Sequence, residues 1–252
     1  MKLRMLLAGL AMAVLLGVPH GLAVDPVLVA PGDEDLDCNG AAERTVSYPE
    51  PTDPSLTRTV HVFCQATTGT GPGALASCSS TAYTLTGWHW NARYAAKVDS
   101  ANSGLSSSAV VSGFQGSGNT WDSSTSGSIM GTVSAGGSGS NAGRRDGVNQ
   151  LGWKHLANGV IAQTTTWSSG SSAVESDGAY GTSFPWSTSG AANAMDLQNI
   201  ATHEIGHTFG LGHPATNSAN ACLTMYAYAD YGETQKRSLG TGDINGIKAI
   251  YG

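Results

Sequence analysis

Three stretches of the chain carry the apolar pattern of β-strands. In residues 59–63 and 146–153, apolar side chains alternate with other residues, as they do when one face of a strand is buried. Residues 160–167 are the clearest strand, because they are dense in β-branched side chains. Residues 24–80 otherwise show little periodicity and are rich in Pro, Asp and Thr. A sustained pattern therefore begins only after residue 80.

Three further stretches carry apolar side chains at helical spacing. Residues 105–121 form the first. The second is expected to begin near Asn193 or Asp196, either of which can cap the free amides of a helix. The third runs to the end of the chain after a Thr241 or Asp243 cap. The side chains expected on the buried faces are Val110, Phe114, Trp121, Leu197, Ile200, Ala201, Ile205, Ile244, Ile247, Ile250 and Tyr251.

The chain begins with the pattern of a secretory signal peptide. Lys2 and Arg4 precede an apolar run over residues 5–18, and small residues follow near Ala23. A membrane anchor needs about 20 apolar residues, and Pro19-His20 end this run earlier. We therefore expect a signal peptide over residues 1–23, a secreted protein and no membrane partner.

Composition and charge narrow the class of protein. Charged residues make up 12% of the 252 residues, against about 25% in typical domains. The chain holds 34 glycines and has a formal net charge of −6. Binding to nucleic acid relies on basic patches, so the acidic balance argues against that partner. We expect a loop-rich extracellular protein that acts as a monomer.

Four cysteines suit an oxidising compartment and allow three connectivities. The preferred pairing joins Cys38 to Cys64, which would close the N-terminal segment on itself, and Cys78 to Cys222. Spacing alone does not prove it. Residues 24–80 are then either a removable prosegment or a permanent N-terminal extension, and the sequence leaves both open.

An acidic run at residues 35–40 has the alternating oxygen ligands of a calcium loop. The twelfth position, where such loops carry Glu, falls on Val46. We interpret the run as an acidic turn and keep Ca²⁺ as an unproven alternative.

The strongest chemical signal is H-E-x-x-H-x-x-G-x-x-H, which runs from His203 to His213. On a helix, His203 and His207 lie one turn apart and project from one face. Glu204 sits about 100° around the helix from His203, close enough to hold a water molecule that is bound to the same metal ion. Gly210 can adopt the left-handed conformation that ends the helix and returns His213 as a third ligand. Three protein ligands leave one zinc position for water, which is the catalytic arrangement.

A methionine follows the third histidine at Met225, where the metzincin signature requires its Met-turn. The chain resembles the metzincin zinc peptidases, and within them the matrixin (peptidase M10) branch, over about residues 83–252. The final helix also resembles that of a matrixin, since it ends in Tyr251-Gly252. Pro214 is more similar to the serralysins, but Ala227 stands where they carry tyrosine and no calcium-binding Gly-rich repeats follow.

This resemblance implies an α/β (α+β) metzincin catalytic domain over residues 81–252. Its sheet would be twisted, mostly parallel and five-stranded, with three helices and zinc in a cleft under an edge strand. Residues 93–98 would be the first strand. The strand at residues 160–167 would be the edge that pairs with the substrate backbone, and an ordinary internal strand is the alternative. The residues assigned to substrate pairing are Val160, Ile161, Ala162, Gln163 and Thr164.

The motif and the resemblance together predict a secreted zinc endopeptidase that acts on proteins or peptides. One catalytic Zn²⁺ would be held by His203, His207 and His213, and Glu204 would take a proton from water and pass it to the departing amine. Three other side chains have expected roles near the metal. Met225 would support the ligands, and Tyr226 or Tyr228 would contact the oxyanion or substrate.

Two other functions stay open at this level. A secreted binding module with a structural zinc is disfavoured by Glu204 and by the lack of a fourth protein ligand. A zinc hydrolase of non-peptide amides is disfavoured by the strand suited to extended peptides. The family's second, structural zinc is not expected, because residues 160–167 and 173–186 contain no histidine. His61, His89 and His155 lack metal-ligand spacing and are expected to be solvated.

Overall fold

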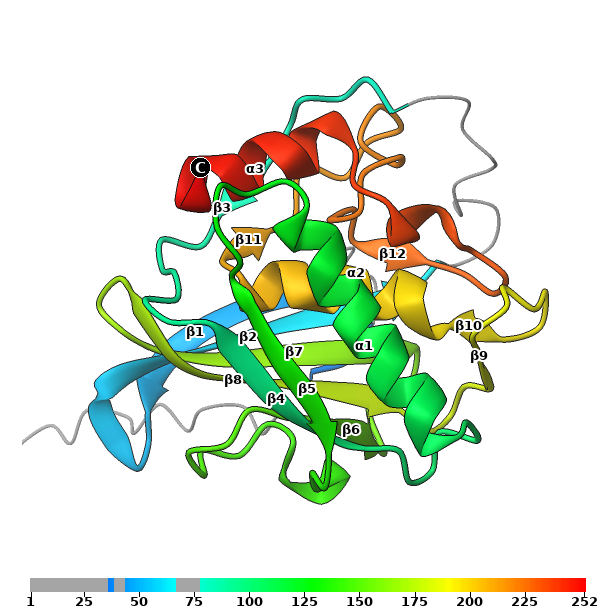
Figure 1. Cartoon of the computed structure of the whole chain (residues 1–252), viewed down its shortest axis with the longest axis horizontal. Coiled ribbons are helices and arrows are strands. Elements are labelled where there is room, and N and C mark those ends of the chain that lie inside the picture. The colour runs from blue at the N-terminus through cyan, green and yellow to red at the C-terminus, as the bar shows by residue number, and fades with distance from the viewer. Residues whose placement is uncertain (1–35, 39–43, 67–77) are drawn as a thin grey trace, which may run out of the picture.

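The computed structural model describes residues 36–38, 44–66 and 78–252 (Figure 1). The expected signal peptide, residues 1–23, lies outside the described residues, as does half of the acidic run at residues 35–40. Within the described ranges, every helix is too short or too polar to span a membrane.

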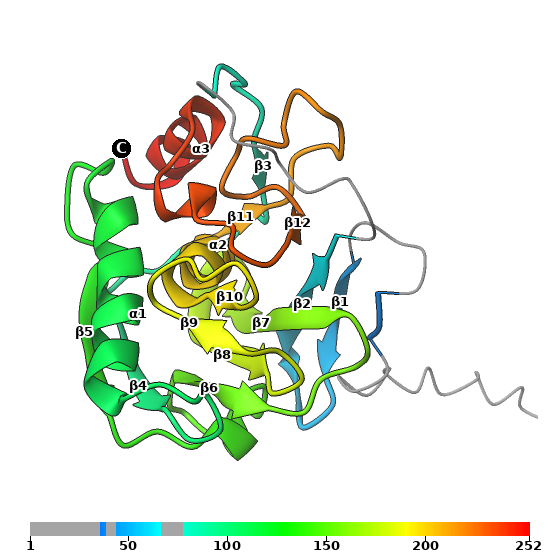
Figure 2. The ribbon, with the colours of Figure 1, turned by 90° about the vertical axis from the view of Figure 1, so that its right-hand side faces the viewer.

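A mixed sheet of eight described strands forms the centre of the molecule (Figures 1 and 2). Its order is β1-β2-β7-β8-β6-β4-β5, and β12 pairs with β2 beside this path. Strands β4, β5, β6 and β8 run parallel, whereas β7 is antiparallel to both of its neighbours. The bounds are β1 Arg44–Glu50, β2 Asp53–Gln65, β4 Tyr94–Asp99, β5 Met130–Ala135, β6 Gln150–Lys154, β7 Val160–Ser169, β8 Ser172–Gly181 and β12 Tyr228–Ala229.

Two short ladders flank the main sheet. Strand β3 (Thr84–Leu85) pairs with β11 (Leu211–Gly212), and β9 (Trp186–Ser187) pairs with β10 (Met195–Asp196). The first ladder fixes the chain just after helix α2 (Leu197–Thr208). The second leads directly into the start of that helix.

The described residues form three α-helices: α1 Ser107–Asp122, α2 Leu197–Thr208 and α3 Thr241–Tyr251. Short 3₁₀ turns lie at η2 Gly139–Asn141 and η3 Gln235–Arg237. Figure 1 shows α1 and α2 side by side over one face of the sheet. The indole Nε1 of Trp121 on α1 donates to the carbonyl oxygen of Thr202 on α2 at 2.8 Å, which ties the two helices together.

The predicted α/β class, the three helices and the parallel centre of the sheet are confirmed. The five expected strands correspond to β7, β8, β6, β4 and β5. The predicted apolar side of the first helix is also correct, because Val110, Phe114 and Trp121 are fully buried.

The prediction that residues 160–167 form an edge strand is wrong. The β1–β2 hairpin adds to the outer side of β7, with a ladder from the Thr57–Ser168 pair to the Cys64–Val160 pair. All residues from Thr59 to Cys64 are buried, so both faces of β2 are covered. A strand buried in this way must pair its backbone groups with neighbouring strands, and the open side of β7 supplies the donors and acceptors.

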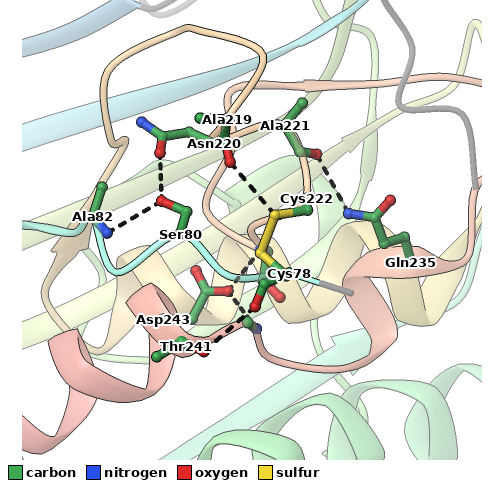
Figure 3. Close-up of a disulfide and its surroundings, with 12 residues drawn as sticks. Cys78, Ser80, Ala82, Ala219, Asn220, Ala221, Cys222, Gln235, Thr241 and Asp243 are labelled. Atoms are coloured by element: carbon green, nitrogen blue, oxygen red, sulfur yellow. Dashed lines mark hydrogen bonds between the residues drawn. A yellow bond between two sulfur atoms is a disulfide. The ribbon is translucent and has the colours of Figure 1, made fainter. Parts of the chain in front are cut away.

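The preferred cysteine pairing is confirmed, since Cys38 bonds to Cys64 and Cys78 bonds to Cys222. The first disulfide holds the end of β2 to the segment before the hairpin. The second fastens the chain at Cys78 to the loop that leads to Met225 (Figure 3). Both bonds are consistent with an oxidising compartment.

Candidate zinc site

Helix α2 presents His203 and His207 because it is fixed at both ends. At its start, the Asp196 carboxylate accepts a hydrogen bond from the Asn199 backbone N–H at 3.0 Å, so one of the two expected caps is correct. At its end, Gly210 has φ +98°, a left-handed conformation that favours glycine. A Cβ at Gly210 would also collide with the carbonyl oxygen of Trp88. The turn at Gly210 sends the chain back toward the helix as β11.

The three motif histidines converge after this turn. Their Nε2 atoms lie 3.0–3.1 Å from one another. The Nδ1 of His203 lies 2.7 Å from the Thr224 carbonyl oxygen, and that of His207 lies 2.8 Å from the Leu211 carbonyl oxygen. A carbonyl accepts only, so Nδ1 carries the proton in both rings and Nε2 keeps its lone pair.

This arrangement fits a zinc ion. Lone pairs that face one another at such short distances repel unless a cation lies between them. Zinc–nitrogen bonds are about 2.0–2.1 Å long, and three nitrogens 3.0–3.1 Å apart can all lie at that distance from one point. His203, His207 and His213 are also the one group of three or more His, Cys, Asp or Glu residues in the described chain with metal-binding spacing.

Burial keeps these rings neutral. His203 and His207 are fully buried and His213 is 7% exposed. Desolvation lowers the pKa of His207 to about 4, and it lowers the pKa of His203 and His213 well below the usual range. Neutral imidazoles are the form that binds metal, so zinc would displace few protons at neutral pH.

Glu204 lies on the same helix with one carboxylate oxygen engaged and one free. Its Oε2 accepts a hydrogen bond from the Thr164 hydroxyl on β7. Its Oε1 is buried without a hydrogen-bond partner among the described residues. Burial raises the pKa of Glu204 to about 8, and the Thr164 hydrogen bond opposes that rise. The carboxyl group can therefore hold a proton near neutral pH, which an acid–base residue must do.

Met225 packs beneath the helix turn that carries the ligands. Gly206 leaves the space for it, because a Cβ there would overlap the Met225 sulfur. The loop around Met225 is held by Asp243, whose carboxylate accepts from the backbone N–H groups of Thr224 at 2.8 Å and Met225 at 3.1 Å. The Thr224 carbonyl oxygen accepts the hydrogen bond from His203 Nδ1. The Asp243 carboxylate therefore orients His203 indirectly, through the backbone of Thr224.

The expected cap of the last helix is only partly right. Helix α3 begins after Gly240, whose backbone N–H donates to Asp243 at 2.8 Å. Sequence reasoning found Asp243 as a cap but missed its contact with the loop around Met225. The loop and α3 are neighbours only in the fold, so no spacing rule connects them.

The two candidate tyrosines lie close to each other. Tyr226 is buried, and its ring centre is 6.0 Å from the Lys236 ammonium nitrogen. Tyr228 is half-buried in β12, with its ring centre 6.0 Å from that of Tyr226. Their role at the oxyanion stays a prediction.

Two rings that sequence reasoning did not assign to the site lie directly on the ligands. His61, expected to be solvated, is 1% exposed and stacks on His207 with ring centres 4.0 Å apart and planes 5° apart. Phe63 stacks on His203 in the same way, at 3.8 Å and 8°. Because imidazole lone pairs lie in the ring plane, two parallel stacked rings cannot both point at one metal ion. His61 therefore covers His207 and is not a fourth ligand in this arrangement.

The two other histidines of the described residues lie apart from this group. His155 is exposed, as expected. His89 is half-buried, and its Nε2 lies 3.1 Å from the Asn91 side-chain oxygen. No sequence signal separates His61 from these two, since its burial depends on the strand that β2 joins.

Comparison with known proteins gives a consistent result. Residues 154–252 match the family described as Matrixin, Peptidase M10. Metalloendoproteinase 1 of Glycine max is 42% identical over 60 residues, which is 24% of this chain and 18% of that protein. Human matrilysin is 35% identical over 65 residues, 26% of this chain and 23% of that one. Human neutrophil collagenase is 33% identical over 95 residues, 38% of this chain and 18% of that one. The matched segments span less than a quarter of each of these relatives.

Proposed function

Residues 154–252 belong to a matrixin catalytic domain, and from this premise we propose that the protein is a zinc-dependent endopeptidase that hydrolyses peptide bonds in proteins. One observation carries the proposal. Three buried imidazole nitrogens converge beside a carboxylate that has one oxygen free. We assign the catalytic domain to residues 81–252.

The proposed roles follow from the contacts of each side chain. His203, His207 and His213 would hold the zinc, which would supply a Lewis acid for the scissile carbonyl and for water. The backbone carbonyl oxygens of Thr224 and Leu211 orient two of the rings. Thr164 fixes Oε2 of Glu204, which leaves Oε1 to take a proton from water and return it to the departing amine.

Other features support the setting of this activity. The two disulfides and the signal-peptide pattern at the start of the sequence support a secreted enzyme. The names of the relatives, matrilysin and neutrophil collagenase among them, describe proteases. We propose that this chain also acts on extracellular protein substrates, as a monomer.

Substitution of Glu204 tests the mechanism. In Glu204→Gln, we expect casein hydrolysis to fall by about 100-fold or more, because general acid–base catalysis contributes at least that much. The zinc content should stay at one per chain, since Glu204 is not a ligand. Chelation should abolish the activity of the unsubstituted protein, and added zinc should restore it. Full activity of a zinc-loaded Glu204→Gln protein would refute the mechanism.

A further inference from the structure

We propose that a chain of buried hydroxyl groups fixes the rotation of helix α2 about its axis, and so positions the zinc ligand His207 and the acid–base residue Glu204. We call this group the hydroxyl chain, and its members are Tyr94, Thr166, Ser176 and Thr208. They are positioning residues, because they act through His207 and Glu204. The inference rests on the proposed endopeptidase function and adds to it the means by which the catalytic geometry is held.

The hydroxyl chain connects the sheet to the end of α2. Thr166 on β7 is the direct cross-strand partner of Ser176 on β8, and their hydroxyl oxygens lie 2.8 Å apart. The Ser176 hydroxyl donates at 3.1 Å to the hydroxyl of Thr208, the last residue of α2. Tyr94 on β4 donates to the Ser176 backbone carbonyl oxygen at 3.1 Å and also forms a hydrogen bond with the Thr208 side chain. In Figure 2, α2 lies over β7 and β8.

Every proton of the hydroxyl chain is used inside it. A hydroxyl group has one proton to donate and can also accept. Since Ser176 gives its proton to Thr208, it accepts from Thr166. Since Tyr94 gives its proton to a carbonyl oxygen, it accepts from Thr208. All four residues have at most 2% of their surface exposed, and a buried network that is satisfied in this way favours one unique arrangement.

A second polar contact lies one helical turn before the first. Glu204 precedes Thr208 by four residues, so both project from the same face of α2. On β7, Thr164 and Thr166 are alternate residues and point to the same side of the strand. The Thr164 hydroxyl donates to the Glu204 carboxylate, as the Ser176 hydroxyl does to Thr208. Helix α2 is therefore hydrogen-bonded to the sheet at two points one turn apart, and two points resist rotation better than one.

The other contacts of α2 constrain its rotation less. Indole groups donate to its backbone carbonyl oxygens, from Trp121 to Thr202 and from Trp90 to Thr208. Apolar contact is non-directional, whereas a hydrogen bond weakens steeply as its angle departs from linear. The apolar side chains that α2 adds to the core are Leu197, Ile200, Ala201 and Ile205.

This rotation matters because the hydroxyl chain ends beside a metal ligand. His207 directly precedes Thr208, so a rotation of the helix at Thr208 moves the His207 ring. The same rotation turns Glu204, which lies one turn earlier on the face of Thr208. A displacement of about 1 Å at a catalytic group can cost about 100-fold in rate. The hydroxyl chain thus controls a geometry on which both metal binding and catalysis depend.

Thr208→Val tests the hydroxyl chain, because valine keeps the shape of the side chain and removes the hydroxyl. Thr208→Ser keeps the hydroxyl and is the conservative variant. Ser176→Ala interrupts the chain at its centre. Thr166→Val removes only the first donor, so it is the milder variant and should give a smaller change in the same direction. Thr165→Val is the matched control, since Thr165 is 2% exposed on β7 and points to the other side of the strand.

Three properties are measured for each variant. The first is the affinity for zinc. The second is the absorption spectrum of the cobalt(II)-substituted protein, which depends on the arrangement of the ligands around the metal. The third is the hydrolysis of casein by the zinc-loaded protein, with kcat and KM determined separately. Urea unfolding of the same variants reports the loss of stability that a purely structural contact would also cause.

In Thr208→Val we expect zinc affinity and kcat each to fall by about 10-fold, as when the hydrogen-bond partner of a metal ligand is removed. The cobalt spectrum should change. KM should stay within about twofold, because the loss affects the transition state and not substrate binding. Thr208→Ser should restore all three properties. The double variant Ser176→Ala/Thr208→Val should lose about 10-fold and not about 100-fold, because both substitutions break one network.

The outcomes separate this inference from the proposed function. If Thr208→Val and Ser176→Ala lose stability but keep the zinc affinity, cobalt spectrum and kcat of Thr165→Val, the hydroxyl chain does not position the site and the inference is refuted. Failure of Thr208→Ser to restore these properties also refutes it, because the hydroxyl is then not the group that matters. If Thr208→Val changes zinc affinity and the spectrum but the unsubstituted zinc-loaded protein leaves casein intact, the hydroxyl chain positions the metal site and the endopeptidase proposal fails.

Discussion

The sulfur of Met225 occupies the space that a Cβ on Gly206 would fill. Gly206 lies on α2 between the two helical histidines, so the methionine supports the turn that spaces them. The ring of Trp121 closes the same space from α1. The residue at position 206 therefore controls how closely α2 packs against Met225 and Trp121.

A methyl group at this position should disturb both stability and metal binding. In Gly206→Ala, we expect the free energy of unfolding to fall by about 1–3 kcal/mol, the usual cost of overpacking a core. Zinc affinity should fall as well, because the shifted helix moves two ligands. Gly127→Ala is the control, since a Cβ there meets no atom within 4 Å. Urea unfolding and zinc titration of both variants check this, and equal stability of the two would contradict it.

Removal of each disulfide should have a different effect. Loop entropy predicts a loss of about 5 kcal/mol for a loop of about 144 residues and about 3.5 kcal/mol for one of about 26, the separations of Cys78–Cys222 and Cys38–Cys64. We therefore expect Cys78→Ala/Cys222→Ala to be the less stable variant in urea unfolding. Cys38→Ala/Cys64→Ala should lose less stability, because its disulfide closes the shorter loop. The reverse order of stability would contradict this assignment.

The zinc motif could be predicted from the sequence because its geometry is local. His203, Glu204 and His207 belong to one helix, and Gly210 turns the chain three residues after His207. Helical spacing and one left-handed glycine are enough to bring His213 back. The same holds for the Asp196 cap, which acts on a backbone amide three residues away.

The cover of the site could not be predicted, because it depends on pairing between distant segments. The alternating pattern at residues 59–63 indicates a strand but not its partner. The ladder from β2 to β7 joins residues about a hundred positions apart, such as His61 and Thr164. Only this register places His61 over His207. The spacing of His61 in the sequence gives no sign of it, so the sequence alone predicts a solvated side chain, as it does for His89 and His155.

The zinc-free protein should be most stable near pH 6.5. Burial lowers the pKa of His207 to about 4, so the unfolded chain binds more protons between about pH 4 and 6.5 and stability falls with acidification. The other buried histidines act in the same direction, namely His61, His203 and His213. Burial raises the pKa of Glu204 and Asp177 to about 8, so the folded chain holds extra protons and stability falls as pH rises toward 8.

Urea unfolding of the chelated protein from pH 4.5 to 8.5 measures this optimum. Each group contributes at most about 1.4 kcal/mol per pH unit. Glu204→Gln should flatten the alkaline side and steepen the acidic side, because Glu204 opposes the effect of the histidines between about pH 4.5 and 6.5. A stability that keeps rising from pH 6.5 to 8 would show that the two carboxyl groups are already ionised in the folded state.

The hydrogen bond from Thr164 to Glu204 should set the acid limb of the activity profile. This bond lowers the pKa of Glu204 against the larger effect of burial. In Thr164→Val the pKa of Glu204 should rise, so the acid limb of kcat/KM should move to higher pH. The kcat at pH 7 should fall by about 10-fold, which corresponds to the loss of about 1.4 kcal/mol of orientation of the carboxylate.

Thr164→Ser keeps the hydroxyl and should restore the profile. Thr165→Val is the matched control, because the next residue of β7 faces the other side of the sheet. Casein hydrolysis by the zinc-loaded protein between pH 5 and 9 distinguishes these variants. A profile of Thr164→Val that coincides with that of Thr165→Val would show that Thr164 does not position the carboxylate.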